Sequence, residues 1–252
     1  MRNVLITGAS RGIGAAIATQ FAAAGDRVAI HHRDSAQLAT DLAAELNACG
    51  PTSADHVVVQ ADLADPQAVL AMVDEAVAQL GGLDVLVNNA GIFFHHPITE
   101  VSYADWQEQW QATIGVNLIG AANVTWCAVR HMKERGGRII NVSSRGAFRG
   151  EPDSPAYGAS KAGLNSFGQS MAVALAPLGI AVATVAPGFV VTDMANEHLK
   201  PPRGDEIRAQ SPFGRVAYPQ EIAAAVLYLA SPLAQWASGA VLDLNGASYL
   251  RT

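Results

Sequence analysis

The sequence predicts one α/β domain, a doubly wound, seven-stranded parallel sheet with helices on both faces that spans residues 1–252. Three observations predict this fold class. Short apolar runs alternate with segments of helical character along the chain. The apolar runs lack the polar alternation of a half-exposed sheet, which indicates strands covered on both faces. Proline lies near the start and glycine near the end of helical segments, which are the positions that these residues favour in helices.

The first half of the chain supplies four predicted strands and three predicted helices. Each helix ends where glycine interrupts the pattern, at Gly25, near Gly50 and at Gly81, and Pro66 opens the third helix. The strands are predicted at residues 4–6, 27–31, 56–60 and 85–87, and the helices at residues 13–24, 35–48 and 66–80.

The second half continues the alternation. A long helical segment at residues 103–135, in one or two pieces, ends at Gly136. Ser154 and Pro155 are predicted as the N-cap and first residue of a helix that runs through residue 176. Strands are predicted at 138–142, 180–186 and 241–244, a further helix at 219–230, and a mobile insertion within the domain at 192–215.

Composition excludes several classes of protein. Half of the 252 residues are hydrophobic, 15% are charged and the net charge is −6, so a packed core is expected and nucleic acid is not an expected partner. Cys49 and Cys127 form no Cys-x-x-Cys pair, which argues against a disulfide scaffold or a cysteine-based metal site. No signal peptide is recognised, and we expect a reducing, cytoplasmic setting. The uncharged stretch 162–192 is broken by Pro177 and Pro187, which predicts a buried helix and strand and no membrane segment.

A glycine-rich turn follows the first predicted strand. Residues 7–14 read Thr-Gly-Ala-Ser-Arg-Gly-Ile-Gly. Glycine allows close approach of the backbone to a pyrophosphate, and the helix N-terminus behind the turn offers free N–H groups. This position favours dinucleotide binding over a simple tight turn. The predicted contacts are Gly8, Ser10, Arg11, Gly12, Ile13 and Gly14.

The residues after the second predicted strand bear on whether NAD or NADP binds. Asp34 has the spacing of an acid that binds ribose hydroxyls in NAD sites, but with Ser35 it can equally cap the next helix. Arg33 and Arg11 are placed to bind a 2′-phosphate, although both are also explained as surface charges. We therefore favour NADP, with NAD as the alternative.

Polar residues follow several strands at one predicted edge. Gly8, Asp62, Asn88 and Ser144 all come just after strand ends. Each alone is explained as a turn residue. Together they mark the edge where open α/β sheets bind ligands.

Tyr157 and Lys161 lie four residues apart on a predicted helix, and therefore on one face. A nearby ammonium group and the positive end of the helix dipole both favour the phenolate, so we expect a lowered pKa for the Tyr157 phenol. Such a hydroxyl can exchange a proton near neutral pH. The alternative is an ordinary surface pair.

Taken together, these residues closely resemble the short-chain dehydrogenase/reductase family, and within it the 3-oxoacyl carrier-protein reductases. The motifs occur in the family's order over essentially the whole chain. They are residues 7–14, residues 88–91, Asn117, Ser144, Tyr157 with Lys161, Pro187-Gly188 with Thr192, and the tail 241–246.

The resemblance implies a Rossmann-type fold and hydride transfer between a nicotinamide and a carbonyl or secondary alcohol, 3-oxoacyl thioesters included. It assigns general acid/base catalysis to Tyr157 and a hydrogen bond to the substrate oxygen to Ser144, with Ser143 as its rival. Lys161 would bind the nicotinamide ribose and lower the pKa of Tyr157, and Asn117 would hold a water of a proton relay. Cofactor contacts are expected from Tyr157 and Lys161 and from Asp62, Leu63, Asn88, Asn89, Ala90, Gly91, Pro187, Gly188, Val190 and Thr192.

The substrate side is predicted from three segments, residues 93–96, 145–153 and the insertion 192–215. Phe94, Phe148 and Phe189 are expected to form an apolar wall. Arg145 and Arg149 either meet an anionic substrate or are surface charges. The pairs His31-His32 and His95-His96 are expected in solvated loops, with no metal site.

The predicted helix 155–176 carries one charge, Lys161. Surface helices normally show a polar face, so a second copy of the chain is expected to cover it, in a homotetramer or a homodimer. Two other functions fit the sequence less well. A non-catalytic NADP-binding sensor would not need the Tyr-Lys pair, and a sugar-nucleotide epimerase or dehydratase needs an extra substrate domain that 252 residues do not accommodate.

Overall fold

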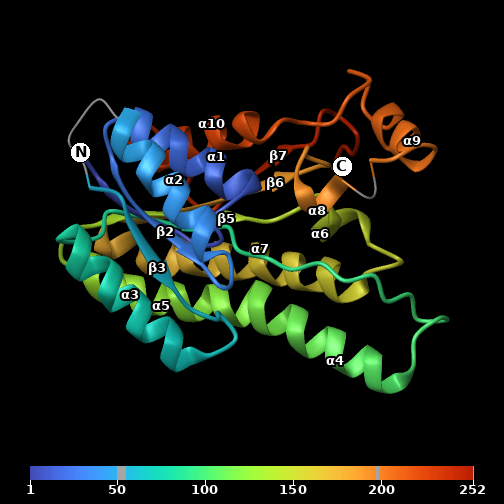
Figure 1. Ribbon diagram of the computed structural model, residues 1–252, viewed down its shortest axis with the longest axis horizontal. Coiled ribbons are helices and arrows are strands. Elements are labelled where there is room, and N and C mark those ends of the chain that lie inside the picture. The colour runs from blue at the N-terminus through green and yellow to red at the C-terminus, as the bar shows by residue number, and fades with distance from the viewer. Residues whose placement is uncertain (50–54, 197–198, 252) are drawn as a thin grey trace.

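The computed structural model describes residues 1–49, 55–196 and 199–251, and it confirms the predicted sheet (Figure 1). Seven strands pair in parallel in the order β3-β2-β1-β4-β5-β6-β7, so the chain winds outward in both directions from β1 and β4. The strands are β1 Asn3–Ile6, β2 Arg27–His32, β3 Val57–Gln60, β4 Val85–Asn88, β5 Gly137–Val142, β6 Ile180–Pro187 and β7 Val241–Leu244.

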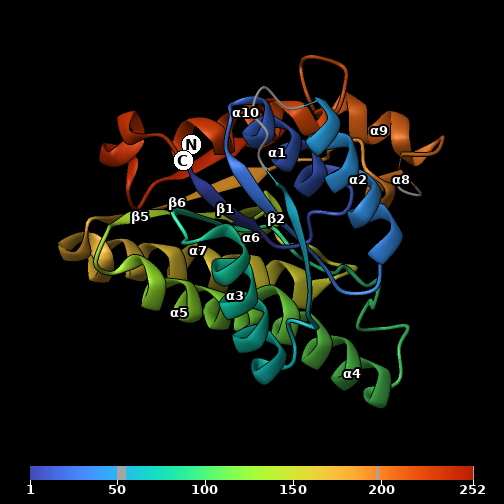
Figure 2. The same ribbon diagram turned by 60° about the vertical axis from the view of Figure 1, so that its left-hand side comes forward.

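Helices cover both faces of this sheet. One face carries α1 (Gly12–Ala23), α2 (Ala36–Cys49) and α10 (Pro219–Leu229). The other carries α3 (Pro66–Leu80), α4 (Tyr103–Ile114), η1 (Gly115–Gly120), α5 (Ala121–Met132) and α7 (Pro155–Leu175). Figures 1 and 2 show the two layers on opposite sides of the strands. Each layer has its own apolar core, with Phe21 in the first and Met132 in the second, so burial of apolar surface holds both layers to the sheet.

The helix ends follow local chemistry. The Asp65 carboxylate accepts hydrogen bonds from the N–H groups of Gln67 and Ala68 at the start of α3, and Gly81 ends that helix in the left-handed conformation. Helix α2 ends at Cys49, and its predicted stop near Gly50 lies outside the described residues.

The long segment predicted at 103–135 is one continuous helical run in which the π-helical turn η1 joins α4 to α5. By length and composition, Tyr103–Met132 could cross a membrane. However, 44% of its most apolar window is buried in the fold, and helices from protein cores pass the same test, so this is weak evidence for a membrane segment.

Hydrogen bonds join the loops at the carboxyl edge of the sheet. Thr7 N–H donates to Val87 O at 3.0 Å, and Arg145 N–H donates to Pro187 O at 2.7 Å. Gly188 N–H donates to Leu244 O at 3.0 Å. The loops that carry the predicted site residues are therefore fixed to the ends of neighbouring strands.

Short helices complete the fold at this edge. They are α6 (Gly146–Arg149), α8 (Asp193–Asn196) and α9 (Arg203–Ala209), with the 3₁₀ turns η2 (Ala176–Leu178) and η3 (Pro232–Ala237) elsewhere. Helices α8 and α9 belong to the predicted insertion 192–215, in which residues 197–198 lie outside the described part, and they project from the sheet edge opposite α4 (Figure 1).

Candidate active site

The glycine-rich turn adopts the geometry that its sequence predicts. Gly8 and Gly12 have φ values of 63° and 59°, which favour glycine. A Cβ on Gly14 would lie 2.3 Å from Gly8 O, so a side chain there would collide with the turn. Helix α1 begins at Gly12 with no side-chain cap and no acidic residue in its first turn. The free N–H groups and dipole at this helix start suit a phosphate group.

Side chains from two neighbouring strands hold this turn. The Asn89 amide donates to Thr7 O at 2.9 Å and to Gly8 O at 3.0 Å. His31 Nδ1 accepts a hydrogen bond from Gly8 N–H at 2.9 Å. Its Nε2 lies 3.1 Å from Ala61 O, so the tautomer with a proton on Nε2 donates to that carbonyl. Sequence reasoning missed His31, because its partners come from β1 and from the end of β3.

The prediction that the histidine pairs occupy solvated loops was wrong for three of the four. His31 and His32 belong to β2, which extends further than predicted, and both are buried. Burial lowers the pKa of His31 to about 4, so its ring stays neutral. His96 is also buried, and its N–H donates to Asp153 O at 2.8 Å, just before α7.

Ser144 and Tyr157 meet at the carboxyl edge of the sheet. Tyr157 lies in the first turn of α7, which Pro155 opens, and its hydroxyl is hydrogen-bonded to the Ser144 side chain. The rival residue, Ser143, is buried and donates its hydroxyl to Lys161 O at 3.2 Å. Ser144 is therefore the serine that faces the tyrosine.

Lys161 lies one helical turn beyond Tyr157, as predicted, with its Nζ 5.8 Å from the centre of the Tyr157 ring. The ammonium group is 3% exposed and donates to Val142 O at 2.9 Å. Burial lowers the pKa of Lys161 to about 8.

The prediction of a lowered pKa for the Tyr157 phenol is wrong for this structure. Burial raises the pKa of Tyr157 to about 12, and the Glu151 carboxylate acts in the same direction, while the hydrogen bond with Ser144 opposes them. Desolvation of the phenolate outweighs the nearby ammonium group, which faces the Val142 carbonyl. Tyr157 is therefore a protonated hydroxyl at neutral pH.

Asn117 lies in the π-helical turn η1, a feature common at functional sites. Its amide forms two hydrogen bonds with the backbone of Ile92, at 2.8 and 3.0 Å, and donates to Ser160 Oγ at 3.1 Å. A Cβ on Gly91 would lie 3.3 Å from Lys161 Nζ and 3.4 Å from Asn117 Oδ1, so the glycine lets these two side chains approach the same backbone segment.

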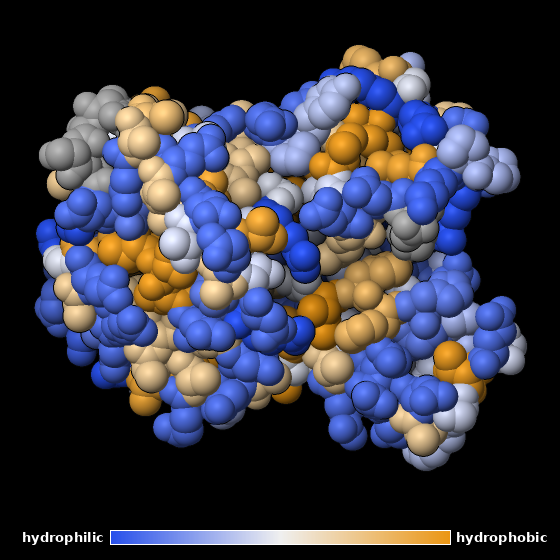
Figure 3. Space-filling model, viewed as in Figure 1, coloured by the Kyte–Doolittle hydropathy of each residue, from blue (hydrophilic) through white to orange (hydrophobic). Residues whose placement is uncertain are grey.

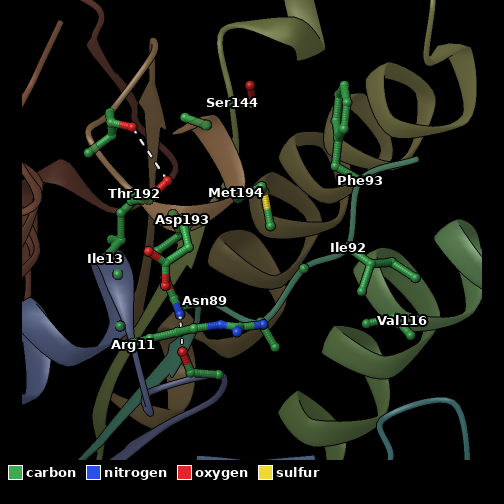
Figure 4. A pocket seen from close by; sticks show the side chains of 18 of the residues that line it. Arg11, Ile13, Asn89, Ile92, Phe93, Val116, Ser144, Thr192, Asp193 and Met194 are labelled. Carbon is green, nitrogen blue, oxygen red and sulfur yellow. Dashed lines mark hydrogen bonds between the residues drawn. The ribbon is translucent and has the colours of Figure 1, made fainter. Parts of the chain in front are cut away.

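One cavity of about 420 Å³ joins these features. It opens between the part of the molecule around α8 and α9 and the part around α4, where Figure 3 shows a hollow, and Figure 4 shows Arg11, Ser144 and Phe93 around it. All the predicted catalytic and cofactor-binding residues line it except two, Asn117 and Asn88. Those that line it are Gly8, Ser10, Arg11, Gly12, Ile13, Gly14, Arg33, Asp62, Leu63, Asn89, Ala90, Gly91, Ser144, Tyr157, Lys161, Pro187, Gly188, Val190 and Thr192.

The expected contact from Asn88 to a cofactor was wrong. The Asn88 side chain is buried in the sheet and donates to Thr125 Oγ1 and Asn141 Oδ1. Because successive residues of a strand point to opposite faces, Asn88 enters the core while Asn89 reaches the cavity.

The end of the cavity near β2 is charged. Arg33 and Asp34 form an exposed ion pair with an Nε–Oδ2 distance of 2.5 Å, and both line the cavity. Arg11 lines the same cavity from the glycine turn. The two guanidinium groups therefore bring positive charge to the same cavity.

The other end has an apolar wall, in which one of the three predicted phenylalanines, Phe189, takes part. Phe93 packs edge-on against Tyr157, with ring centres 5.1 Å apart, and Phe189 also lines the cavity. Phe94 does not line it, and Phe148 packs under the Arg251 guanidinium instead. Arg145 is buried and not a surface charge.

Comparisons with known proteins agree with this geometry. The family model described as enoyl-(acyl carrier protein) reductase matches residues 8–246. The chain is 38% identical over 250 residues to a Staphylococcus aureus protein named 3-oxoacyl-(acyl-carrier-protein) reductase FabG, covering 99% of this chain and 98% of that protein. It is 39% identical over 255 residues to L-rhamnose 1-dehydrogenase (NAD(P)(+)) of Azotobacter vinelandii, covering 99% and 97%. A solved short chain dehydrogenase from Burkholderia cenocepacia in complex with NADP superposes with a TM-score of 0.89 at 36% identity, covering 98% and 97%.

The buried Lys161 predicts a specific pH dependence of stability. Its pKa is about 8 when folded and 10.5 when unfolded, so between pH 8 and 10 the unfolded chain binds the extra proton and stability rises with pH. In the cofactor-free protein, we expect Lys161→Met to remove roughly 2 kcal/mol of this rise. Urea unfolding of both proteins at several pH values measures it. Tyr157 stays protonated in both states over most of this range, and curves that run parallel would contradict the prediction.

Proposed function

The chain belongs to the short-chain dehydrogenase/reductase family, and we propose that this oxidoreductase uses NADPH to reduce a carbonyl group, with Tyr157 as the proton donor. The observation that carries the proposal is the convergence of Ser144, Tyr157 and Lys161 with the glycine turn on one cavity. The glycine turn would hold the pyrophosphate of a dinucleotide at one part of that cavity, and Tyr157 lines the same cavity.

The residues present fit a dinucleotide. The turn leaves no room for a side chain at Gly14, and the uncapped start of α1 supplies N–H groups for a pyrophosphate. Arg11 and Arg33 would bind a 2′-phosphate, which supports NADP over NAD. The relative in complex with NADP supports the same choice. When bound, the reduced nicotinamide supplies the hydride.

Tyr157 and Ser144 would act together on the substrate oxygen. Because the phenol pKa is raised to about 12, Tyr157 is protonated at neutral pH and suited to donate a proton as negative charge develops on that oxygen. Ser144, hydrogen-bonded to the phenol, would donate a second hydrogen bond to the same oxygen.

Lys161 and Asn117 would support Tyr157. With a pKa of about 8, Lys161 can lose and regain a proton near neutral pH, which suits a group that binds the nicotinamide ribose and replaces the proton given up by Tyr157. Asn117 holds the Gly91–Ile92 backbone next to Lys161. We infer that it also holds the water that continues this relay.

The substrate class follows from the apolar end and from the relatives. Phe93 and Phe189 form an apolar wall beside Tyr157 that fits the carbon chain of a ketone or a 3-oxoacyl thioester. The relatives are named for a 3-oxoacyl thioester and for a sugar. We infer that the insertion 192–215 moves to admit the substrate, because α9 meets the loop between α6 and α7 through a polar contact, the Arg203–Asp153 pair at 3.7 Å.

The outer face of α7 supports a homodimer or homotetramer. Its exposed residues are all uncharged, namely Ala159, Ala162, Ser166, Gln169, Ser170, Val173 and Ala174. Val173 is 79% exposed, and an uncharged stripe of this kind is normally covered by another subunit. Cys49 and Cys127 are unpaired, which is consistent with the cytoplasmic setting that we propose.

Tyr157→Phe tests the proton donor. We expect NADPH binding to be retained and turnover of a ketone panel, including an acetoacetyl thioester, to fall at least about a hundredfold. Binding is measured by NADPH fluorescence and turnover by the absorbance of reduced nicotinamide. Near-normal turnover in the variant would overturn the mechanism. Tight NADPH binding without turnover by the unaltered protein would instead fit a non-catalytic sensor.

Arg33→Ala tests the cofactor choice. Loss of a guanidinium group from the 2′-phosphate is expected to raise the KM for NADPH about tenfold or more. The KM for NADH, which lacks this phosphate, is expected to change little and serves as the internal control. Equal changes for both cofactors, or a lower KM for NADH than for NADPH in the unaltered protein, would contradict NADP preference.

Val173→Glu tests the assembly. We expect light scattering to give a mass of two or four chains for the unaltered protein and a smaller assembly for the variant, because a charge on the stripe must be desolvated on association. Leu38→Glu, at an exposed apolar position on α2, is the matched control and is expected to keep the assembly. A monomer at micromolar concentration in the unaltered protein would reject the proposal.

A further inference from the structure

Glu151 is an acidic side chain in the wall of the cavity next to Tyr157. It follows α6, is half-buried and lines the cavity. Gly146 makes room for it, and Gly158 of α7 lies at contact distance. A Cβ on Gly146 would lie 2.6 Å from Glu151 Oε1, and a Cβ on Gly158 would lie 3.8 Å from Glu151 Cβ. The backbone around Glu151 is thus shaped to keep this carboxylate beside the reacting centre.

The neighbouring charged side chains already have partners. Arg145 donates to Gln210 Oε1 at 2.9 Å and to Ser248 Oγ at 2.7 Å. Arg149 donates to the same Gln210 oxygen at 2.8 Å. Arg203 pairs with Asp153 at 3.7 Å.

The Glu151 carboxylate, in contrast, has no hydrogen bond or ion pair with any of residues 1–49, 55–196 and 199–251. A half-buried acceptor without a donor costs free energy that a ligand can recover. The carboxylate is close enough to Tyr157 to influence the ionisation of its phenol. Glu151 also lies against Gly158, the residue after Tyr157, and both Glu151 and Tyr157 line the cavity, so a substrate held at Tyr157 shares this cavity with the carboxylate.

We propose that Glu151 is a specificity residue that accepts a hydrogen bond from a substrate hydroxyl near the reacting carbon, so that the preferred substrate is a hydroxylated ketone or the corresponding diol. The inference rests on the proposed function of the same cavity. It narrows the substrate from carbonyl compounds in general to those that carry a hydroxyl group beside the carbonyl.

Two other ligand groups fit the charges less well. A carboxylate would be repelled by Glu151, and the guanidinium groups that would bind it are engaged by Gln210, Ser248 and Asp153. An ammonium group would face the positive field of three arginines around Glu151. A neutral hydroxyl avoids both repulsions.

Two ketones that differ by one hydroxyl test the proposal. We expect the unaltered protein with NADPH to reduce 3-hydroxy-2-butanone with a kcat/KM at least about tenfold above that for 2-butanone, because the extra hydroxyl satisfies a half-buried charged acceptor. Glu151→Gln keeps the shape beside Gly146 but removes the charge, and is expected to reduce this ratio severalfold. Glu134→Gln makes the same chemical change at an exposed position that does not line the cavity and is expected to leave the ratio unchanged.

A pH profile separates this role from simple support of the loop. The charged groups around Tyr157 and Glu151 are Arg145, Arg149, Asp153 and Arg203, together with Lys161 on α7, which both proteins share and which titrates near pH 8. Because the Glu151 carboxylate opposes formation of the Tyr157 phenolate, its removal is expected to move the alkaline loss of reductase activity to lower pH. If the variant only loosened the loop, the alkaline loss of activity would not move consistently to lower pH.

Binding distinguishes failure of this proposal from failure of the proposed function. Ligand-observed NMR on the NADP⁺-loaded protein compares 2,3-butanediol with 2-butanol, which needs no turnover. A preference for the diol that Glu151→Gln abolishes supports the proposal even if no ketone is reduced. Equal binding of the two alcohols, an unchanged ratio in Glu151→Gln, or tighter binding of 3-hydroxybutyrate than of the diol would overturn it.

Discussion

Parallel pairing of all seven strands is the constraint on which the rest of the structure depends. Because every strand runs in the same direction, every loop that follows a strand emerges at one edge of the sheet. The backbone hydrogen bonds from Thr7 to Val87 and from Arg145 to Pro187 then fix these loops to their neighbours. The glycine turn, Ser144 and the loop after β6 consequently share one cavity although they are far apart in the sequence.

Burial at this edge decides the chemistry of the two ionisable groups on α7. Burial keeps the Tyr157 phenol protonated and makes the charged form of Lys161 costly. The single Val142 carbonyl that accepts from the Lys161 ammonium group holds it against the end of β5. The same low-dielectric setting makes the unpartnered Glu151 carboxylate a strong acceptor beside the tyrosine. The proton donation proposed for Tyr157 and the substrate selection proposed for Glu151 would thus share one physical origin in this cavity.

Sequence patterns predicted the fold and most of the cavity, because apolar runs and glycine positions are local signals of strands and turns. They failed where the deciding partner comes from a distant segment. His31 looked like a loop residue until its contacts with Gly8 and Ala61 were seen. The direction of the Tyr157 pKa shift depended on burial by elements that no short motif reveals. The wrong choice of Phe94 over Phe93 has the same origin, since only the path of the chain after β4 decides which ring faces Tyr157.

The central claim is that this edge of the sheet aligns a nicotinamide with a carbonyl carbon while a protein hydroxyl supplies the proton. Transfer of label from NADPH deuterated at C4 to 3-hydroxy-2-butanone tests it most directly, with the product alcohol analysed by mass spectrometry and NMR. Direct hydride transfer predicts one deuterium on the new carbinol carbon from only one of the two C4 diastereomers of the labelled cofactor. Deuterium that is lost to water, or absent from the product, would contradict it.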